Sequence, residues 1–195
     1  MDIQPNQFYH IYNQGNNKEP IFFKRENYLY FLRNFRSKIA INVDILSYCL
    51  MPNHFHFLVH TTEQSVIKRR NGIVELTALM DGFRRLESGY AQAINKQEQR
   101  SGSLFRQKTK VKLIEDTSKD YLFSVFNYIH QNPVKAGLVK KMENWEFSSF
   151  RDYAGLRDGT LCNKELAKLC IDYSEHNFVK ESNSYVDKEK IKLIF

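Results

Sequence analysis

The chain has 195 residues and a formal net charge of +7, with 29 lysines and arginines against 22 acidic residues. Hydrophobic residues make up 42% of it, which is enough for a core, and the absence of a run of about 18 uncharged apolar residues argues against a membrane-spanning protein. The positive charge favours a polyanionic partner such as nucleic acid. The amino terminus lacks the pattern of a secretory signal, and three cysteines without metal-finger spacing favour free thiols in a reducing cytoplasm.

The hydrophobic pattern predicts strands and helices in alternation along the first 132 residues. The expected strands are 8–13, 43–50, 54–60 and one within 100–115, and the expected helices are 27–40, 73–94 and 118–132. Pro52 pre-sets a tight turn between the second and third strands, Ser118 is a candidate N-cap, and Pro133 is expected to end the last helix. A polar, basic linker is expected at 62–71.

This order, β-α-β-β-α-β-α, begins with the six elements of the ferredoxin-like split βαβ arrangement. We therefore predict an α+β fold, a ferredoxin-like antiparallel sheet with helices on one face. After about residue 140 the signals become short and irregular, apart from a weak helix at 163–171. We expect one domain over residues 1–155 and a C-terminal extension over residues 156–195.

The stretch "MPNHFHFLVH" at 51–60 carries three histidines in seven positions. Side chains alternate along a strand, so His54 and His56 share a face about 6.6–7 Å apart and could lean onto one ion. His60 lies on that face too, but about 13 Å from His56, which is too far for the same ion. Histidines without a ligand would explain the pattern equally well, and a metal pair needs a third ligand from elsewhere in the fold.

The predicted helix that ends "FNYIHQNPVKAG" places Tyr128 and Asn132 on one face, one turn apart. An amide oxygen is an acceptable ligand for Mg²⁺ or Mn²⁺, so Asn132 could join His54 and His56 and leave open positions for phosphate oxygens. A tyrosine on a helix usually only packs, and Asn before Pro commonly starts a turn. Spacing alone leaves both roles open.

These motifs resemble those of the single-tyrosine transposases of the HUH endonuclease superfamily, in the branch of the REP-associated and IS200-like tyrosine transposases. The resemblance rests on "FYHIYNQGNNKEPIF", "SYCLMPNHFHFLVH", "RSGSLFRQKTK", "YLFSVFNYIHQNPVKAGLV" and "WEFSSFRDYAG", which together span about residues 8–155. It implies a ferredoxin-like domain that nicks and rejoins single-stranded, hairpin-associated DNA in transposition through a 5′-phosphotyrosine intermediate.

Carried over residue by residue, the resemblance implies Tyr128 as the nucleophile, His54 and His56 as metal ligands, and Asn132 as the third ligand to Mg²⁺ or Mn²⁺. Gln131 is the alternative third ligand. The resemblance also implies single-stranded or hairpin DNA as the partner, a bacterial, cytoplasmic and nucleoid-associated location, and a homodimer as one option for assembly.

Basic side chains are expected to contact the DNA phosphates. The candidates are Lys68, Arg69, Arg70, Arg100, Arg106, Lys108, Lys110 and Lys112, with Arg84 and Arg85 as further basic positions. The last three lysines alternate along the expected fourth strand and so share a face, where they could line a phosphate track or simply protect a sheet edge. Tyr9, His10 and Tyr12 are candidates for stacking on bases, against core packing as the alternative.

Two other functions fit parts of this pattern. A domesticated hairpin-binding protein with little or no catalysis needs the basic surface but neither Tyr128 nor an ion. A zinc hydrolase built on His54 and His56 needs a third His, Asp or Glu ligand and is indifferent to Tyr128.

Overall fold

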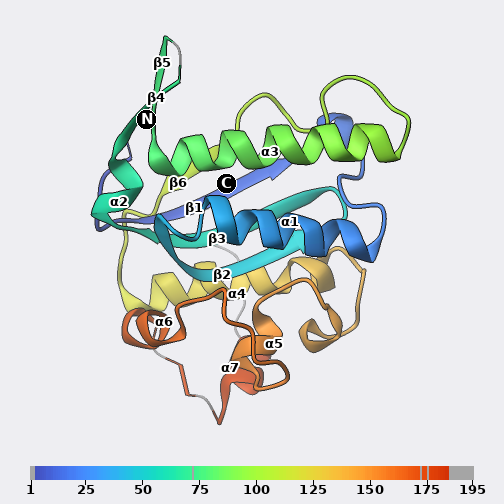
Figure 1. Cartoon of the computed structure of the whole chain (residues 1–195). Helices are drawn as coiled ribbons and strands as arrows, with labels where there is room; N and C mark the ends of the chain where they lie inside the picture. The colour runs from blue at the N-terminus through green and yellow to red at the C-terminus, as the bar shows by residue number, and fades with distance from the viewer. Residues whose placement is uncertain (1–2, 72, 172, 175, 185–195) are drawn as a thin grey trace.

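The computed structural model describes residues 3–71, 73–171, 173–174 and 176–184. Its centre is a four-stranded sheet in the order β2-β3-β1-β6 (Figure 1). The strands are β1 (Phe8–Gln14), β2 (Val43–Met51), β3 (His54–Thr61) and β6 (Lys110–Leu113). β1 and β3 are central and pair antiparallel with each other and with the edge strands. The predicted α+β fold with a ferredoxin-like antiparallel sheet is confirmed.

Two long helices, α1 (Arg25–Lys38) and α3 (Ala78–Gln97), lie side by side on one face of this sheet (Figure 1). The Phe35 ring of α1 stacks on Phe57 of β3 with centroids 3.9 Å apart, and it meets Phe83 of α3 edge-on at 5.9 Å. These aromatic contacts belong to the hydrophobic core between the helices and the sheet. The helices of the split βαβ unit therefore share one face, as predicted.

A third long helix, α4 (Lys119–Lys135), packs on the opposite face of the sheet, against β2 and β3. The predicted arrangement with helices on one face therefore holds for α1 and α3 but not for α4. Neighbouring side chains of a strand point to opposite faces, so His56 faces away from the layer that Phe57 contacts. The Tyr128 ring of α4 lies edge-on to the His56 ring at 6.2 Å. The helix starts where predicted, because the Ser118 side chain accepts a backbone N–H of the first turn.

The predicted end of this helix at Pro133 is wrong, because the helix continues to Lys135. Proline has no N–H for the carbonyl of Ile129, four residues earlier. The side chain of Asn132 supplies the missing donor, with its Nδ2 atom 3.3 Å from that carbonyl oxygen. Gly137, with a φ of +70°, then ends the helical path in the left-handed conformation that favours glycine.

The expected basic linker at 62–71 is instead a short helix followed by a β-hairpin that projects beyond α3 (Figure 1). The elements are α2 (Glu63–Val66), β4 (Lys68–Asn71) and β5 (Val74–Thr77). Ile73, expected on the apolar stripe of α3, lies at the hairpin turn and is 98% exposed. The long helix begins after Thr77, whose side chain accepts a backbone N–H of the first turn.

A short helix η1 (Asn16–Lys18) follows β1. The chain after α4 forms four more short helices, η2 (Met142–Asn144), α5 (Phe150–Tyr153), α6 (Lys164–Cys170) and α7 (Phe178–Ser184). The weak helix predicted at 163–171 is confirmed as α6. Phe178 packs against Phe126 of α4 at 6.1 Å, and Ile171 and Phe178 belong to the same hydrophobic core as the strands.

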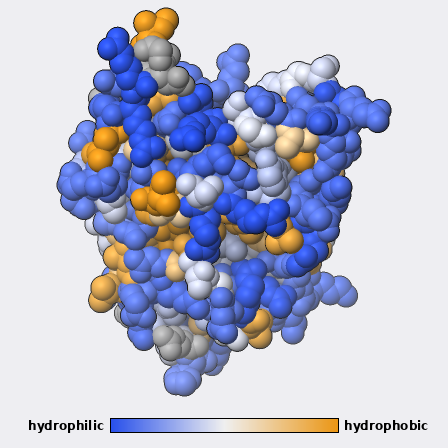
Figure 2. Space-filling model, in the orientation of Figure 1, coloured by the Kyte–Doolittle hydropathy of each residue, from blue (hydrophilic) through white to orange (hydrophobic). Residues whose placement is uncertain are grey.

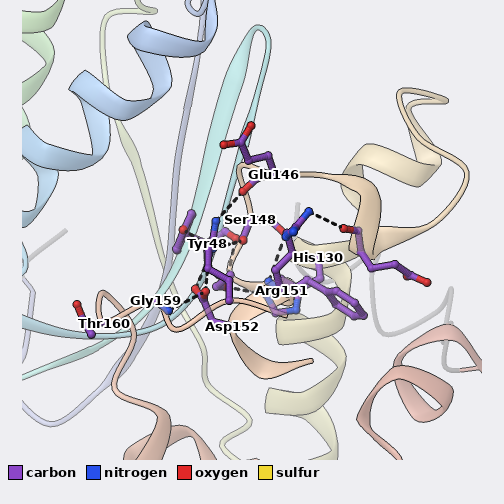
Figure 3. A network of polar contacts seen from close by, with 12 residues as sticks. Tyr48, His130, Glu146, Ser148, Arg151, Asp152, Gly159 and Thr160 are labelled. Atoms are coloured by element: carbon purple, nitrogen blue, oxygen red, sulfur yellow. Dashed lines mark hydrogen bonds and ion pairs between the residues drawn. The ribbon is translucent and has the colours of Figure 1, made fainter. Parts of the chain in front are cut away.

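An ion pair with a buried carboxylate holds the segment after α4 against strand β2 (Figure 3). The Asp152 carboxylate accepts from Arg157 Nε at 2.5 Å, and the side chain of Asp152 is only 1% exposed. The Arg157 guanidinium also donates to the backbone carbonyls of Glu146 at 2.8 Å and Ser148 at 2.7 Å. It reaches the Tyr48 hydroxyl of β2 at 3.0 Å. One guanidinium thus satisfies four acceptors from three parts of the chain.

The described part of the chain contains no helix that is both long and apolar enough to cross a membrane. Cys49 and Cys162 are buried free thiols, and Cys170 is a partly exposed one. Burial raises the pKa of the Cys49 and Cys162 thiols, so neither is a reactive thiolate.

Candidate functional site

A pocket of about 350 Å³ lies between α4 and the sheet. It is lined by Tyr12, Asn13, Gln14, His54, His56, Arg106, Lys108, Lys110, Tyr128 and Asn132. The pocket brings together residues from β1, β3, β6, α4 and the loop before β6, which are far apart in the sequence. All four residues predicted for the chemistry, two histidines, a tyrosine and an asparagine, line it.

The two histidines of β3 point into this pocket as alternate side chains of one strand. Their ring centroids are 4.9 Å apart. His54 Nδ1 is 2.6 Å from the amide oxygen of Asn53, and His56 Nδ1 is 2.9 Å from Nε2 of His10. An amide oxygen only accepts hydrogen bonds, so Nδ1 of His54 carries the hydrogen and its Nε2 keeps a lone pair for a ligand.

Burial keeps both histidines neutral near pH 7. It lowers the pKa of His54 to about 4 and that of His56 well below the ordinary value, and the nearby His10 lowers the pKa of His56 further. A metal ion binds the neutral ring, so neither side chain has to lose a proton first. This is the protonation state that a ligand pair requires.

Tyr128 stands over the pocket as a neutral phenol. Burial raises its pKa to about 12, the neighbouring Tyr12 adds to the rise, and a hydrogen bond from Asn132 opposes it. Lys135, nearly two turns later on α4, places its Nζ atom 4.6 Å from the centroid of the Tyr128 ring. Lys135 therefore makes a cation–π contact with the Tyr128 ring.

Asn132 and Gln131 point in different directions from α4. Asn132 lines the pocket, and its Nδ2 atom donates to the backbone carbonyl of Tyr128 at 2.9 Å. Its Oδ1 atom is therefore the atom suited to coordinate a cation. Gln131 instead donates to the carbonyl of Ser182 in α7 at 3.0 Å. The structure does not bring the alternative third ligand to the pocket.

His60 and His130, which belong to the same two elements as the predicted site residues, lie outside the pocket. His60 packs on Phe8 with ring centroids 4.7 Å apart, and His130 is buried with Nε2 2.7 Å from the Ser149 hydroxyl. Among the residues that the structure describes, no group of three His, Cys, Asp or Glu side chains could hold an ion. The zinc-hydrolase alternative therefore lacks its third ligand within that part of the chain.

The predicted basic residues divide between the pocket and other surfaces. Arg106, Lys108 and Lys110 line the pocket. In β6, Lys110 pairs with Tyr12 and Lys112 pairs with His10, so both lysines lie on the sheet face that carries the histidines. The strand begins only at Lys110, so the predicted alternation holds for these two lysines, while Lys108 lies in the loop before them.

The other basic candidates do not line the pocket. Arg100 pairs with the Glu19 carboxylate at 3.2 Å. Lys68, Arg69 and Arg70 form strand β4 of the projecting hairpin, where Figure 2 shows hydrophilic surface below a hydrophobic tip. The fold thus separates a basic pocket wall from a basic projecting hairpin.

The prediction that Tyr9 and His10 stack on bases is wrong, because both side chains are buried. Tyr9 is 1% exposed in the core and His10 is completely buried, while Tyr12 lines the pocket. The sequence analysis did not predict the contact of His10 with His56. Alternation along β1 shows which side chains share a face of that strand, but not which residue of β3 each one meets. The signal lies in the pairing of β1 with β3, which places Tyr12 opposite His56 and His10 beside it, and register is not visible in either strand alone.

Glu87 of α3 lies behind the pocket, where its carboxylate contacts the pocket residue Asn13, and its raised pKa predicts a pH-dependent stability. Its carboxylate accepts from Asn13 at 3.2 Å and from the Thr109 hydroxyl, and burial raises its pKa. The pKa of Glu87 is higher in the folded protein than its value of 4.5 in the unfolded chain. The stability that Glu87 contributes is therefore complete below pH 4.5 and is lost as the pH rises through the folded pKa. Relative to wild type, Glu87→Gln should therefore gain stability as pH rises through this window. Urea unfolding at about pH 4 and pH 7 measures this, and an unchanged difference between the two proteins would contradict it.

The chain is similar in sequence to a curated protein and in fold to a solved structure. No family model matches the chain. A curated Haemophilus influenzae protein described as a REP-associated tyrosine transposase is 29% identical over 109 residues, which cover 55% of this chain. The chain spans 58% of that relative's length.

The solved structure of a REP-associated tyrosine transposase bound to a REP hairpin has the same fold. The TM-score is 0.56 at 22% identity, over 80% of this chain and 85% of that one. The relative and the structural neighbour carry the same family name. Together they confirm the family resemblance that the motifs predict, which is to the REP-associated tyrosine transposases.

Proposed function

We propose that this protein is a metal-dependent DNA nickase and strand transferase of the transposase type, acting on single-stranded DNA beside a hairpin. The observation that carries the proposal is the meeting of His54, His56, Asn132 and Tyr128 in one pocket with a basic wall. The hairpin bound to the structural neighbour supports the same class of DNA as the partner here.

The donor set fits a divalent cation. His54 and His56 would offer their Nε2 atoms and Asn132 its Oδ1 atom, because the other polar atom of His54 and of Asn132 is engaged by a neighbour. Two imidazoles and an amide oxygen suit Mn²⁺ or Mg²⁺ when phosphate oxygens complete the set. When bound, the ion would neutralise charge on the scissile phosphate.

Tyr128 is the proposed nucleophile. Its Oη atom forms a bond to phosphorus while the bond from phosphorus to the 3′-oxygen breaks, which leaves a 5′-phosphotyrosine and a free 3′-hydroxyl. The phenol proton is lost to water and the departing 3′-oxygen gains one, so the step is balanced without another reactant. Attack of a second 3′-hydroxyl on the phosphotyrosine would rejoin DNA and restore the tyrosine.

The basic wall would hold the backbone of the DNA. Arg106, Lys108 and Lys110 line the pocket that holds the nucleophile, so a phosphate there would lie between cations and the Tyr128 hydroxyl. Lys135 contacts the ring of Tyr128 from the same helix. The cations that would hold the phosphate and the cation on the ring of the nucleophile thus come from different elements.

The test is a denaturing gel of the protein mixed with labelled hairpin oligonucleotides that carry single-stranded flanks. In Mn²⁺ or Mg²⁺ we expect a covalent protein–DNA adduct and a shortened strand with a free 3′-hydroxyl, both lost in EDTA. Hairpin binding with no adduct in either metal, across a broad set of flanks, would contradict the proposal and favour the domesticated binder.

The two lysines of β6 should contribute to the salt dependence of DNA binding. Each lysine that neutralises a phosphate of single-stranded DNA adds about 0.7 to the slope of log K against log salt. The double variant Lys110→Gln/Lys112→Gln should therefore lower the slope by about 1.4, measured by fluorescence anisotropy at several salt concentrations. Arg100→Gln, which removes a cation already paired with Glu19 away from the pocket, is the control and should keep the slope. An equal loss in both variants would show that the pocket face has no special role in binding.

A further inference from the structure

We infer that His10 is a positioning residue that sets the metal-binding tautomer of His56. The inference rests on the proposed function, because it assigns His56 as a ligand. His10 lies on β1 and His56 on β3, and the separation of His10 Nε2 from His56 Nδ1 is 2.9 Å. Both side chains are buried, with exposed fractions of 0% and 3%.

A hydrogen bond between two ring nitrogens contains one hydrogen, so one ring donates and the other accepts. If His56 donates from Nδ1, its Nε2 atom keeps a lone pair. If His10 donates from Nε2, the hydrogen of His56 is on its own Nε2 atom, which then cannot coordinate an ion. Coordination through Nε2 of His56 therefore requires His10 to act as the acceptor.

The two ligands differ in how their tautomer is fixed. His54 Nδ1 faces the amide oxygen of Asn53 at 2.6 Å, and that oxygen can only accept. His56 faces a group that can either donate or accept, so the tautomer of His10 decides that of His56. The outer partner of a metal-bound histidine commonly fixes its tautomer and orientation, and loss of such a partner typically weakens metal binding by about 10- to 100-fold.

The surroundings hold the His10 ring in place for this task. It lies beside two other rings, Tyr12, with centroids 4.9 Å apart and planes at 26°, and His56, with centroids 5.1 Å apart and planes at 17°. β1 is a central strand of the sheet, hydrogen-bonded on both sides to β3 and β6. A ring packed in this way has little freedom to turn its Nε2 atom away from His56.

Two variants of His10 distinguish its role as a hydrogen-bond acceptor from its role in packing. His10→Phe keeps a flat ring beside Tyr12 and His56 but offers no acceptor, whereas His10→Gln can place an amide oxygen near the former Nε2 position. Isothermal titration with Mn²⁺ should show a dissociation constant raised about 10- to 100-fold in His10→Phe and within a few-fold of wild type in His10→Gln. His60→Phe, on the same face of β3 but outside the pocket, is the matched control and should bind Mn²⁺ as wild type does.

A second measurement needs no variant. Long-range ¹H–¹⁵N spectra of the wild-type histidines, with Mg²⁺ bound, report which nitrogen of each ring carries the hydrogen. We expect it on Nδ1 of His56 and on Nδ1 of His10, which makes Nε2 of His10 the acceptor. A hydrogen on Nε2 of His56 would overturn the inference, even if His10→Phe failed to fold.

The outcomes separate this inference from the proposed function. Equal Mn²⁺ affinity of wild type and His10→Phe would overturn the role of His10 and leave the proposed function standing. Normal metal binding with the expected tautomers but no DNA cleavage would support His10 and contradict the nickase. A wild-type protein that binds neither ion would overturn both.

Discussion

Tyr128→Phe is expected to abolish the covalent protein–DNA adduct and to leave hairpin binding within a few-fold of wild type. The substitution removes only the Oη atom, and the ring can keep its contacts with His56 and Lys135. Removal of a nucleophile that acts together with its partners typically lowers the rate by at least about 10⁴-fold. The measurement is the denaturing gel described above, with binding measured separately by fluorescence anisotropy.

Tyr12→Phe is the matched control, because Tyr12 lines the same pocket from β1. It should form the adduct at a rate near that of wild type. An adduct that persists in Tyr128→Phe but is lost in Tyr12→Phe would move the nucleophile to β1. Metal-dependent cleavage without an adduct in Tyr128→Phe would identify water as the attacking group and favour a hydrolase.

Arg157→Met should lower the free energy of unfolding by about 3 kcal/mol or more. The variant leaves the Asp152 carboxylate, 1% exposed, without its cation, and Gly159 contributes only a backbone N–H at 3.2 Å. The carbonyls of Glu146 and Ser148 lose a donor as well. Loss of one partner of a buried pair is costly because the remaining charge stays buried. Urea unfolding of the variant and wild type gives the difference.

Arg25→Met is the control for a general effect of removing an arginine. Its pair with Glu146 is exposed, with side chains 57% and 41% accessible, so the expected loss is much smaller than that in Arg157→Met. The double variant Asp152→Asn/Arg157→Met should be less unstable than the sum of its single variants, because no unpaired charge remains. A loss in Arg157→Met no larger than that in Arg25→Met would show that the buried pair contributes little.

Local patterns in the sequence predict the fold class and the four residues that meet in the pocket. The alternation of β3 fixes the shared face of His54 and His56, and the four-residue spacing fixes that of Tyr128 and Asn132. Both are properties of a single element. For this reason they are visible before any element is placed beside another.

The features that the sequence did not predict depend on contacts between elements, or on a side chain that replaces a lost backbone hydrogen bond. Pro133 is a reliable helix breaker in isolation, but the Asn132 side chain replaces the lost donor to the carbonyl of Ile129. Gln131 faces α7 only because that helix packs on the outer side of α4. The role of His10 requires the register between β1 and β3. Ile73 lies exposed at the turn of the hairpin after α2, but its spacing from Leu76 matches that of an apolar helical stripe, so the helix was predicted to start too early.

The helix that carries Tyr128 is packed on both of its sides, and this limits how the chemistry can be completed. One side faces the sheet, and the other is tied down by His130 on Ser149 at 2.7 Å and Gln131 on Ser182 at 3.0 Å. A side chain on such a helix has no long excursion open to it between cleavage and rejoining. The tyrosine would stay beside the histidines of its own chain while the two DNA ends exchange places around it. The slow step of a full cycle would then be a rearrangement of nucleic acid, and its rate should follow the length and stiffness of the DNA flank.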